Sequence, residues 1–346
     1  NLKISVFKKA WQRIIERHPI LRTSFYWENL DKPYQVVYRQ VELPWEFRDW
    51  RELPSQEQQA QLEIFLENDR EYGFVLSHAP LIRLTLIRIG EDTYHFVFRH
   101  HHILMEGWSI TWLWKEFYGF YYAFCKGQDF DLERPRQYKE YILWIQQQNI
   151  SKAETFWRQK LNGFTSPTSL GVNKASGNIF SQNDNCDTQN CQLSHSFTES
   201  LKSFASRHQL TLNVLFKGAW ALFLSRYSGE EDIVFGATSS GRPAELAEAE
   251  SMVGLFINTL PVRVQVSSNA VLLPWLKQLQ AQEAEMRQYE YAPLMQIQQW
   301  SEVPPGLPLF ESLVVFNNYF IDSTQSELAE SFGLSRRQLF EKTNYP

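Results

Sequence analysis

The sequence is organised around one stretch, which reads Arg99-His100-His101-His102-Ile103-Leu104-Met105-Glu106-Gly107-Trp108-Ser109. Residues 93–100 alternate and are predicted to form a strand, while residues 108–124 are apolar almost all round and predict a buried helix. Three consecutive histidines therefore fall at the end of a strand, where a rigid scaffold often presents functional groups on a loop.

The two-residue period of a strand divides the side chains around the histidines between two faces. One face is predicted to carry Phe96, Phe98, His100 and His102, and the other His95, Val97, Arg99 and His101. Histidine titrates near neutral pH, so an ordered group at a strand end is a candidate for proton transfer. Gly107 predicts a turn of the backbone that a larger residue would not tolerate.

Outward from this stretch, helical and strand patterns follow one another along the whole chain, which predicts an α/β (α+β) fold with helices covering mixed sheets. Hydrophobic residues make up 43% of the 346 residues, enough for substantial cores, and the length suits two domains. Predicted helices cover residues 2–17, 55–72, 108–124, 138–148, 152–161, 198–208, 212–225, 273–289 and 293–301. Predicted strands cover residues 22–27, 34–38, 80–88, 93–100, 232–238, 261–266 and 312–316.

Charge and composition exclude several classes of partner. The net charge of −5 gives no basic surplus for a phosphate backbone, so nucleic acid is not expected. No apolar run approaches the ~20 residues of a membrane span, and three cysteines do not suggest a disulfide framework. We therefore expect a cytoplasmic protein without a membrane partner.

Several kinds of chemistry remain open from the residues alone. The histidines can serve in acid–base chemistry, or they can be surface polar groups that Glu106 neutralises. A metal site made by His100, His102 and Glu106 is the sharper alternative, although no further ligand falls at suitable spacing. A nucleophilic triad is disfavoured because Ser109 lacks the Gly-x-Ser-x-Gly setting, and no phosphate-binding glycine pattern occurs.

The stretch His101-His102-Ile103-Leu104-Met105-Glu106-Gly107 resembles the His-His-x-x-x-Asp-Gly signature of the condensation domains of non-ribosomal peptide synthetases, within the chloramphenicol-acetyltransferase-like superfamily. Further stretches are similar to the family's other motifs, in the family's order, over nearly the whole chain. They are residues 17–23 (Arg-His-Pro-Ile-Leu-Arg-Thr), 138–146 with Trp157, Gly241-Arg242-Pro243 with 252–261, and 310–319.

This resemblance implies two acetyltransferase-like lobes in a V with a tunnel between them, each a mixed sheet covered by helices. We place the N-terminal lobe at residues 1–160 and the C-terminal lobe at residues 161–346. Both lobes are expected to be incomplete, because the family has an opening strand and helix before Asn1 and closing strands after Pro346.

The implied activity is acyl transfer that forms an amide bond in secondary-metabolite synthesis. Upstream and downstream peptidyl carrier proteins would deliver thioesters on phosphopantetheine arms, beside an adjacent adenylation domain in a multidomain chain, and the domain itself would bind no cofactor or metal. An epimerization domain of the same fold and a catalytically inactive carrier-docking platform are the alternatives, whereas a heterocyclization domain would carry an aspartate motif instead.

The resemblance also assigns roles to residues. His102, the second motif histidine, would accept the proton of the attacking amine or orient it, and His101 and Gly107 of the motif are further candidates for the catalytic site. Glu106 stands where the family has Asp and would be structural, paired with an arginine for which Arg17 is the expected candidate. Further family-matched candidates are Arg22, Trp157 and Arg242, for which packing and strand-end ion pairs are the alternative explanation. Ser109 is a further secondary candidate.

Overall fold

The computed structural model describes residues 2–170 and 188–317. The described chain forms two compact units that are not contiguous in sequence. Residues 242–256 group with the first unit, which otherwise ends at residue 147, and residues 148–241 and 257–317 form the second. The division into lobes at residue 160 stays a prediction; the compact units change over at residues 147/148, 241/242 and 256/257.

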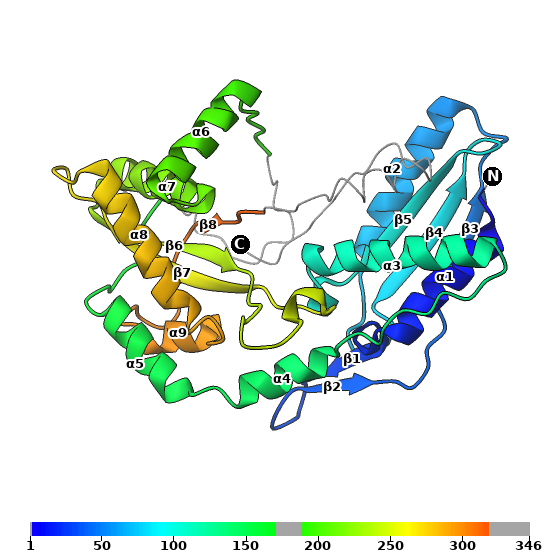
Figure 1. Ribbon diagram of the computed structural model, residues 1–346, viewed down its shortest axis with the longest axis horizontal. Helices are drawn as coiled ribbons and strands as arrows, with labels where there is room; N and C mark the ends of the chain where they lie inside the picture. The colour runs from blue at the N-terminus through cyan, green and yellow to red at the C-terminus, as the bar shows by residue number, and fades with distance from the viewer. Residues whose placement is uncertain (1, 171–187, 318–346) are drawn as a thin grey trace. The chain divides into compact units, whose positions relative to one another are not determined.

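The first unit is built on the sheet β3-β4-β5, coloured blue to cyan in Figure 1. Strand β4 (Ile82–Arg88) pairs antiparallel with β5 (Tyr94–His100) and parallel with β3 (Trp45–Asp49), which the sequence analysis did not predict. A separate hairpin pairs β1 (Thr23–Tyr26) with β2 (Tyr34–Val37). The short helix η1 (Pro19–Arg22) precedes β1, and η2 (His102–Leu104) follows β5. A third, η3 (Ala249–Ser251), lies in the segment 242–256.

Four longer helices complete the first unit: α1 (Ile4–Arg17), α2 (Ser55–Tyr72), α3 (Gly107–Cys125) and α4 (Tyr138–Gln146). Helix α1 buries a stripe at three- and four-residue spacing and ends at Arg17, with His18 as its C-cap before Pro19. Its Trp11 stacks on Phe96 and Phe98 of β5 and on Phe117 of α3. The predicted face of β5 that carries these phenylalanines therefore faces the core between α1, α3 and the sheet.

The opposite face of the same sheet meets α2. Arg99 of β5 and Arg83 of β4, which lie opposite each other in register, both bind Asp69 of α2. The predicted alternation is thus confirmed for both faces within the strand, and the sheet is covered by helices on each side. His102, predicted to share the face of Phe96 and Phe98, lies beyond the strand as the first residue of η2.

The second unit holds the sheet β7-β6-β8, with β6 (Asp232–Ser239) antiparallel to β7 (Asn258–Gln265) and parallel to β8 (Leu313–Val314). Its helices are α5 (Ile150–Leu161), α6 (His195–His208), α7 (Leu212–Ser228), α8 (Leu272–Arg287) and α9 (Leu294–Trp300). Apolar side chains from the helices and the sheet form one continuous core. The mixed α/β class is confirmed, and the predicted elements agree within about three residues at their ends.

Candidate functional site

The three histidines occupy a turn that leaves the end of β5. His100 is the last residue of the strand, His101 precedes η2, and His102 is its first residue. The backbone N–H of His101 donates to the carbonyl of Leu81 at 3.0 Å, which continues the pairing with the chain preceding β4. Leu104 and Met105 after the histidines are completely buried, so the turn is fixed to the core at both ends.

His101 is held by its own ring. Its Nδ1 accepts a hydrogen bond from the backbone N–H of Ile103 at 3.1 Å. A neutral imidazole that accepts at Nδ1 carries its proton at Nε2, so this contact selects one tautomer. His101 therefore shapes the turn, and the side chain of His102, directly after it, is exposed.

The two histidines before His102 are held in the neutral state. Burial lowers the pKa of His100 to about 4, with smaller contributions from the charges of His102 and His101. Burial also lowers the pKa of His101, again helped by His102. The site thus presents one exposed imidazole beside two that stay uncharged at neutral pH.

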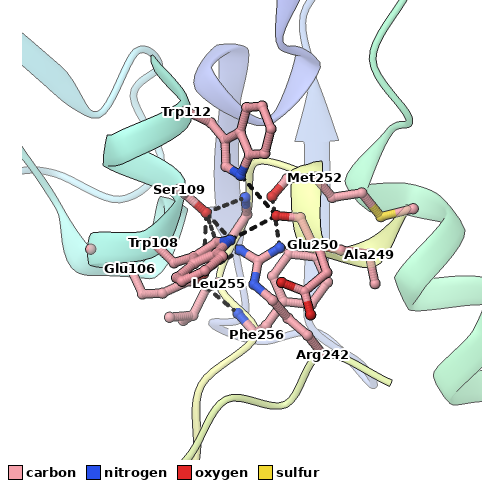
Figure 2. Close-up of polar contacts among 12 residues, drawn as sticks. Glu106, Trp108, Ser109, Trp112, Arg242, Ala249, Glu250, Met252, Leu255 and Phe256 are labelled. Atoms are coloured by element: carbon pink, nitrogen blue, oxygen red, sulfur yellow. Dashed lines mark hydrogen bonds and ion pairs between the residues drawn. The ribbon is translucent and has the colours of Figure 1, made fainter. Parts of the chain in front are cut away.

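Glu106, five residues after His101, lies in a buried ion pair with Arg242 (Figure 2). Its Oε1 accepts from the Arg242 guanidinium and lies 3.2 Å from the Ser109 hydroxyl, and its Oε2 accepts from the backbone N–H of Phe256 at 3.1 Å. The side chains of Glu106 and Arg242 are 3% and 5% exposed. A buried charge requires such partners, so Glu106 supports the structure.

The segment 242–256 folds around the same guanidinium. Arg242 donates to the carbonyls of Ala249 and Met252, the latter at 3.0 Å, and its guanidinium carbon lies 4.0 Å from the centre of the Phe256 ring. Figure 2 shows two tryptophans of α3 converging on the Glu250 carbonyl, with Trp108 Nε1 at 2.7 Å and Trp112 Nε1 at 2.9 Å. Segment 242–256 is therefore fastened to α3 along two turns of the helix.

Ser109 links the same segment to the first turn of α3. Its buried hydroxyl lies 2.8 Å from the carbonyl of Gly254 and accepts from the Gly254 N–H at 3.1 Å. It also accepts from Arg242 at 3.1 Å. Because it is enclosed by these groups, Ser109 is a structural hydroxyl, in agreement with the sequence-based argument against a triad.

The predicted pairing of Arg17 with Glu106 is wrong. Arg17 pairs with Glu116 through Nε and Oε2 at 3.1 Å, and Glu116 also contacts His18 Nε2 at 2.7 Å. The reason is geometric: Glu116 lies ten residues beyond Glu106, or ~15 Å along a helix that rises 1.5 Å per residue. Arg17, at the end of α1, therefore contacts α3 at Glu116, about three helical turns beyond Glu106.

The remaining candidates make other contacts, each within its own unit. The Arg22 guanidinium donates to backbone carbonyls, including those of Ile15 at 3.1 Å and Arg39 at 2.9 Å, and so joins α1 to the chain after β2. Trp157 is buried in the second unit, where its Nε1 lies 3.4 Å from the Tyr289 carbonyl. Gly107 begins α3 and is not among the described glycines with positive φ, so the turn predicted there does not use a left-handed backbone conformation.

The geometry gives little support to a metal bound by His100, His102 and Glu106. Both Glu106 oxygens are occupied by donors from Arg242 and the Phe256 backbone. Across residues 2–170 and 188–317, no three His, Cys, Asp or Glu side chains are grouped so that they could hold a metal ion. In the same residues no helix has the length and apolar character to cross a membrane.

Solved structures share this fold. The X-domain from teicoplanin biosynthesis matches with a TM-score of 0.75 and 22% identity, over 90% of this chain and 70% of that one. The starter condensation domain of rhizomide synthetase matches with a TM-score of 0.72 and 20% identity, over 91% and 70%. At such identities the likeness concerns the fold alone, the mixed α/β fold that this chain shares with these two domains.

The chain belongs to the condensation-domain family, whose model matches residues 1–345. A linear gramicidin synthase polypeptide from Brevibacillus parabrevis is 44% identical over all 346 residues. Chondramide synthase cmdD from Chondromyces crocatus is 38% identical over 340 residues, 98% of this chain. The chain spans only 7% and 8% of the length of these two relatives. The family suggested by the motifs is thus confirmed.

The histidines and Glu106 could be identified from the sequence, but the arginine that pairs with Glu106 was predicted wrongly. The signal for the right partner was present, since Gly241-Arg242-Pro243 was already one of the family-matched stretches. Arg242 lies 136 positions from Glu106, and local spacing carries no information about a contact of that range. The roles of Trp108, Trp112 and the Glu250 carbonyl had no sequence signal.

Proposed function

We propose that this domain is an amide-bond-forming acyltransferase of a non-ribosomal peptide synthetase. The amine of an acceptor aminoacyl thioester attacks the carbonyl carbon of a donor acyl or peptidyl thioester. A C–N bond forms, the C–S bond of the donor breaks, and the proton lost by the amine ends on the departing thiolate. Both substrates are carried on phosphopantetheine arms, and the domain binds no cofactor of its own.

The observation that carries this proposal is the arrangement of the histidine turn. His101 is fixed by its hydrogen bond with Ile103, while His102 begins η2 with its side chain exposed. An imidazole at such a place can accept the proton of an attacking amine or orient the amine by a hydrogen bond. His102 is therefore the proposed catalytic residue.

Few other side chains are needed for this reaction. A thioester is already activated, so much of the rate can come from holding both reactants within attack distance. The enclosed hydroxyl of Ser109 fits a mechanism without a covalent nucleophile. Glu106 and Arg242 take no part in proton transfer in this proposal; they hold segment 242–256 against the helix that follows the turn.

The partners follow from the same proposal. Upstream and downstream peptidyl carrier proteins present the donor and the acceptor, and an adjacent adenylation domain loads the acceptor carrier within a cytoplasmic multidomain chain. The relatives that the chain matches are far longer than the matched region, as expected for such a chain. The two acetyltransferase-like lobes, at residues 1–160 and 161–346, remain part of the proposal.

The test uses two carrier proteins, one loaded with a donor aminoacyl thioester and one with an acceptor, and detects the dipeptidyl product by mass spectrometry. We expect His102→Ala to lower the single-turnover rate by ~10²–10⁴-fold, the range of general acid–base catalysis. His78→Ala is the matched control, because His78 is an exposed histidine outside the turn whose Nδ1 contacts the neighbouring Ser77 hydroxyl. Equal rates for His102→Ala and wild type would remove His102 from the mechanism.

The same assay separates the alternatives. An epimerization domain would leave the two thioesters separate and invert the α-carbon of one, which chiral analysis of the recovered amino acid detects. A docking platform would bind the carriers without either change. Product formation by the wild type with neither inversion nor a requirement for a further domain supports the condensation proposal.

A further inference from the structure

Two arginines lie side by side on the strands that lead to the histidine turn. Arg83 of β4 and Arg99 of β5 are register partners on antiparallel strands, a placement that brings like charges together and is unfavourable without compensation. Asp69 of α2 compensates both: one oxygen accepts from Arg83 Nη2 at 2.8 Å, and the other accepts from Arg99. All three side chains are at most 22% exposed.

The last residue of α2 and the chain directly after it surround the guanidinium of Arg83. The Arg83 guanidinium carbon lies 4.9 Å from the centre of the Tyr72 ring and 4.4 Å from that of the Phe74 ring, and Nη1 donates to the Gly73 carbonyl at 2.6 Å. Gly73 has φ 58° and ψ −153°, a conformation essentially restricted to glycine. Helix α2 thus ends at Tyr72, and the turn at Gly73 places the Phe74 ring against the guanidinium groups of Arg83 and Arg99.

Phe74 is also in contact with the histidine turn. Its ring meets the His101 ring edge-to-face, with centroids 6.2 Å apart and an interplanar angle of 86°. The Arg99 guanidinium carbon lies 6.0 Å from the same phenyl centre. The His101 ring is thereby held on one side by Phe74 and at Nδ1 by the backbone of Ile103.

We propose that Phe74, seated on the Asp69-bridged pair of Arg83 and Arg99, is a positioning residue that fixes the His101 ring and so directs the side chain of His102. The inference rests on the proposed function, because its effect on rate is an effect on amide-bond formation. Phe74 touches no reacting atom in this proposal. It acts through His101, the residue that precedes η2.

The test combines an NMR readout in the free protein with the single-turnover condensation assay. Histidine ring resonances are assigned with isotope-labelled protein, the His101 signal being the one lost in His101→Gln. We expect Phe74→Leu to shift the His101 ring resonances, because the ring current of Phe74 is removed, and to lower the rate by ~10-fold through misplacement of His102. Phe74→Tyr, which keeps the ring, is expected to retain the wild-type His101 signal and rate.

The matched control is Phe65→Leu, which removes another half-buried phenylalanine of the same unit that lies under a guanidinium, that of Arg48 at 4.5 Å. It should leave both the His101 signal and the rate unchanged. If Phe74→Leu does not fold, as judged by circular dichroism, Phe74→Met takes its place.

Unchanged His101 resonances and an unchanged rate in the folded Phe74 variant would overturn the proposal, and so would equal effects from Phe65→Leu. A wild-type protein that forms no amide would refute the proposed function instead. In that case the NMR comparison by itself decides whether Phe74 positions His101.

Discussion

Replacing Arg242 by methionine is the most informative perturbation of the site. The change removes the charge opposite Glu106 while keeping much of the apolar volume, and it also removes the donors to the Ala249 and Met252 carbonyls. Removing one partner of a buried ion pair costs ~3–5 kcal/mol. Because both side chains are at most 5% exposed, we expect the loss in unfolding free energy to fall in that range.

The control is Arg13→Met, because Arg13 pairs with Asp129 in the same unit with exposed fractions of 43% and 71%. Surface pairs of this kind contribute ~0–1 kcal/mol. Urea denaturation measures both variants at equal protein concentration. Amide hydrogen exchange provides a second measurement. The Phe256 amide donates to Glu106 and should exchange faster in the Arg242→Met variant.

A double variant sharpens the test. Adding Glu106→Gln to Arg242→Met removes the uncompensated charge, so the double variant should be more stable than Arg242→Met alone. If Arg242→Met costs no more than Arg13→Met, or if amide exchange across residues 242–256 does not change, the argument that this ion pair fastens the segment is refuted.

Three further outcomes are expected. Glu106→Asp should leave condensation activity equal or higher, because Asp is the acid of the family motif and keeps the charge; a large loss would show that the longer side chain is required. Gly254→Ala should destabilise the first unit by at least ~1–3 kcal/mol, because an added Cβ would lie 2.0 Å from the Tyr138 ring. Gly90→Ala is the control, because the nearest atom to a Cβ there is 3.4 Å away. Thermal denaturation should show a much smaller loss of stability for Gly90→Ala than for Gly254→Ala. The free energy of unfolding should fall on acidification between pH 6.5 and about 4, because the pKa of buried His100 is about 4 in the folded protein and the unfolded chain binds the proton first. The slope is at most ~1.4 kcal/mol per pH unit, so the loss from pH 6.5 to 5 is ~2 kcal/mol. His100→Gln should reduce this slope, as measured by urea denaturation at several pH values.

Local pattern predicted the elements that depend on local physics. The stripe on α1 and the alternation of β5 each report one buried face, and both agree with the structure. Strand β3 was not predicted, because its residues are half-buried or exposed and its pairing with β4 is non-local. Its sequence, Trp-Glu-Phe-Arg-Asp, carries only a short alternation between proline and charged residues.

The site shows the same limit. The position of His102 could be predicted, because a strand end is a local feature. The partner of Glu106 could not be predicted, because Arg17 and Arg242 can donate equally well and only the packing of the chain decides between them. The contact of Phe74 with His101 also depends on where α2 ends, which a single glycine determines.

The grouping of residues 242–256 with the first unit has a consequence for synthesis on the ribosome. Residues 2–147 emerge long before Arg242 and Phe256, so the Glu106 carboxylate has neither its counter-ion nor its backbone donor during that interval. The N-terminal part can collapse early around Trp11 and its neighbours, but its polar interior is completed only after most of the second unit has been translated. Nascent chains halted before residue 242 should therefore bind chaperones or be cleaved by protease near α3, whereas chains halted well beyond residue 256 should be protected there.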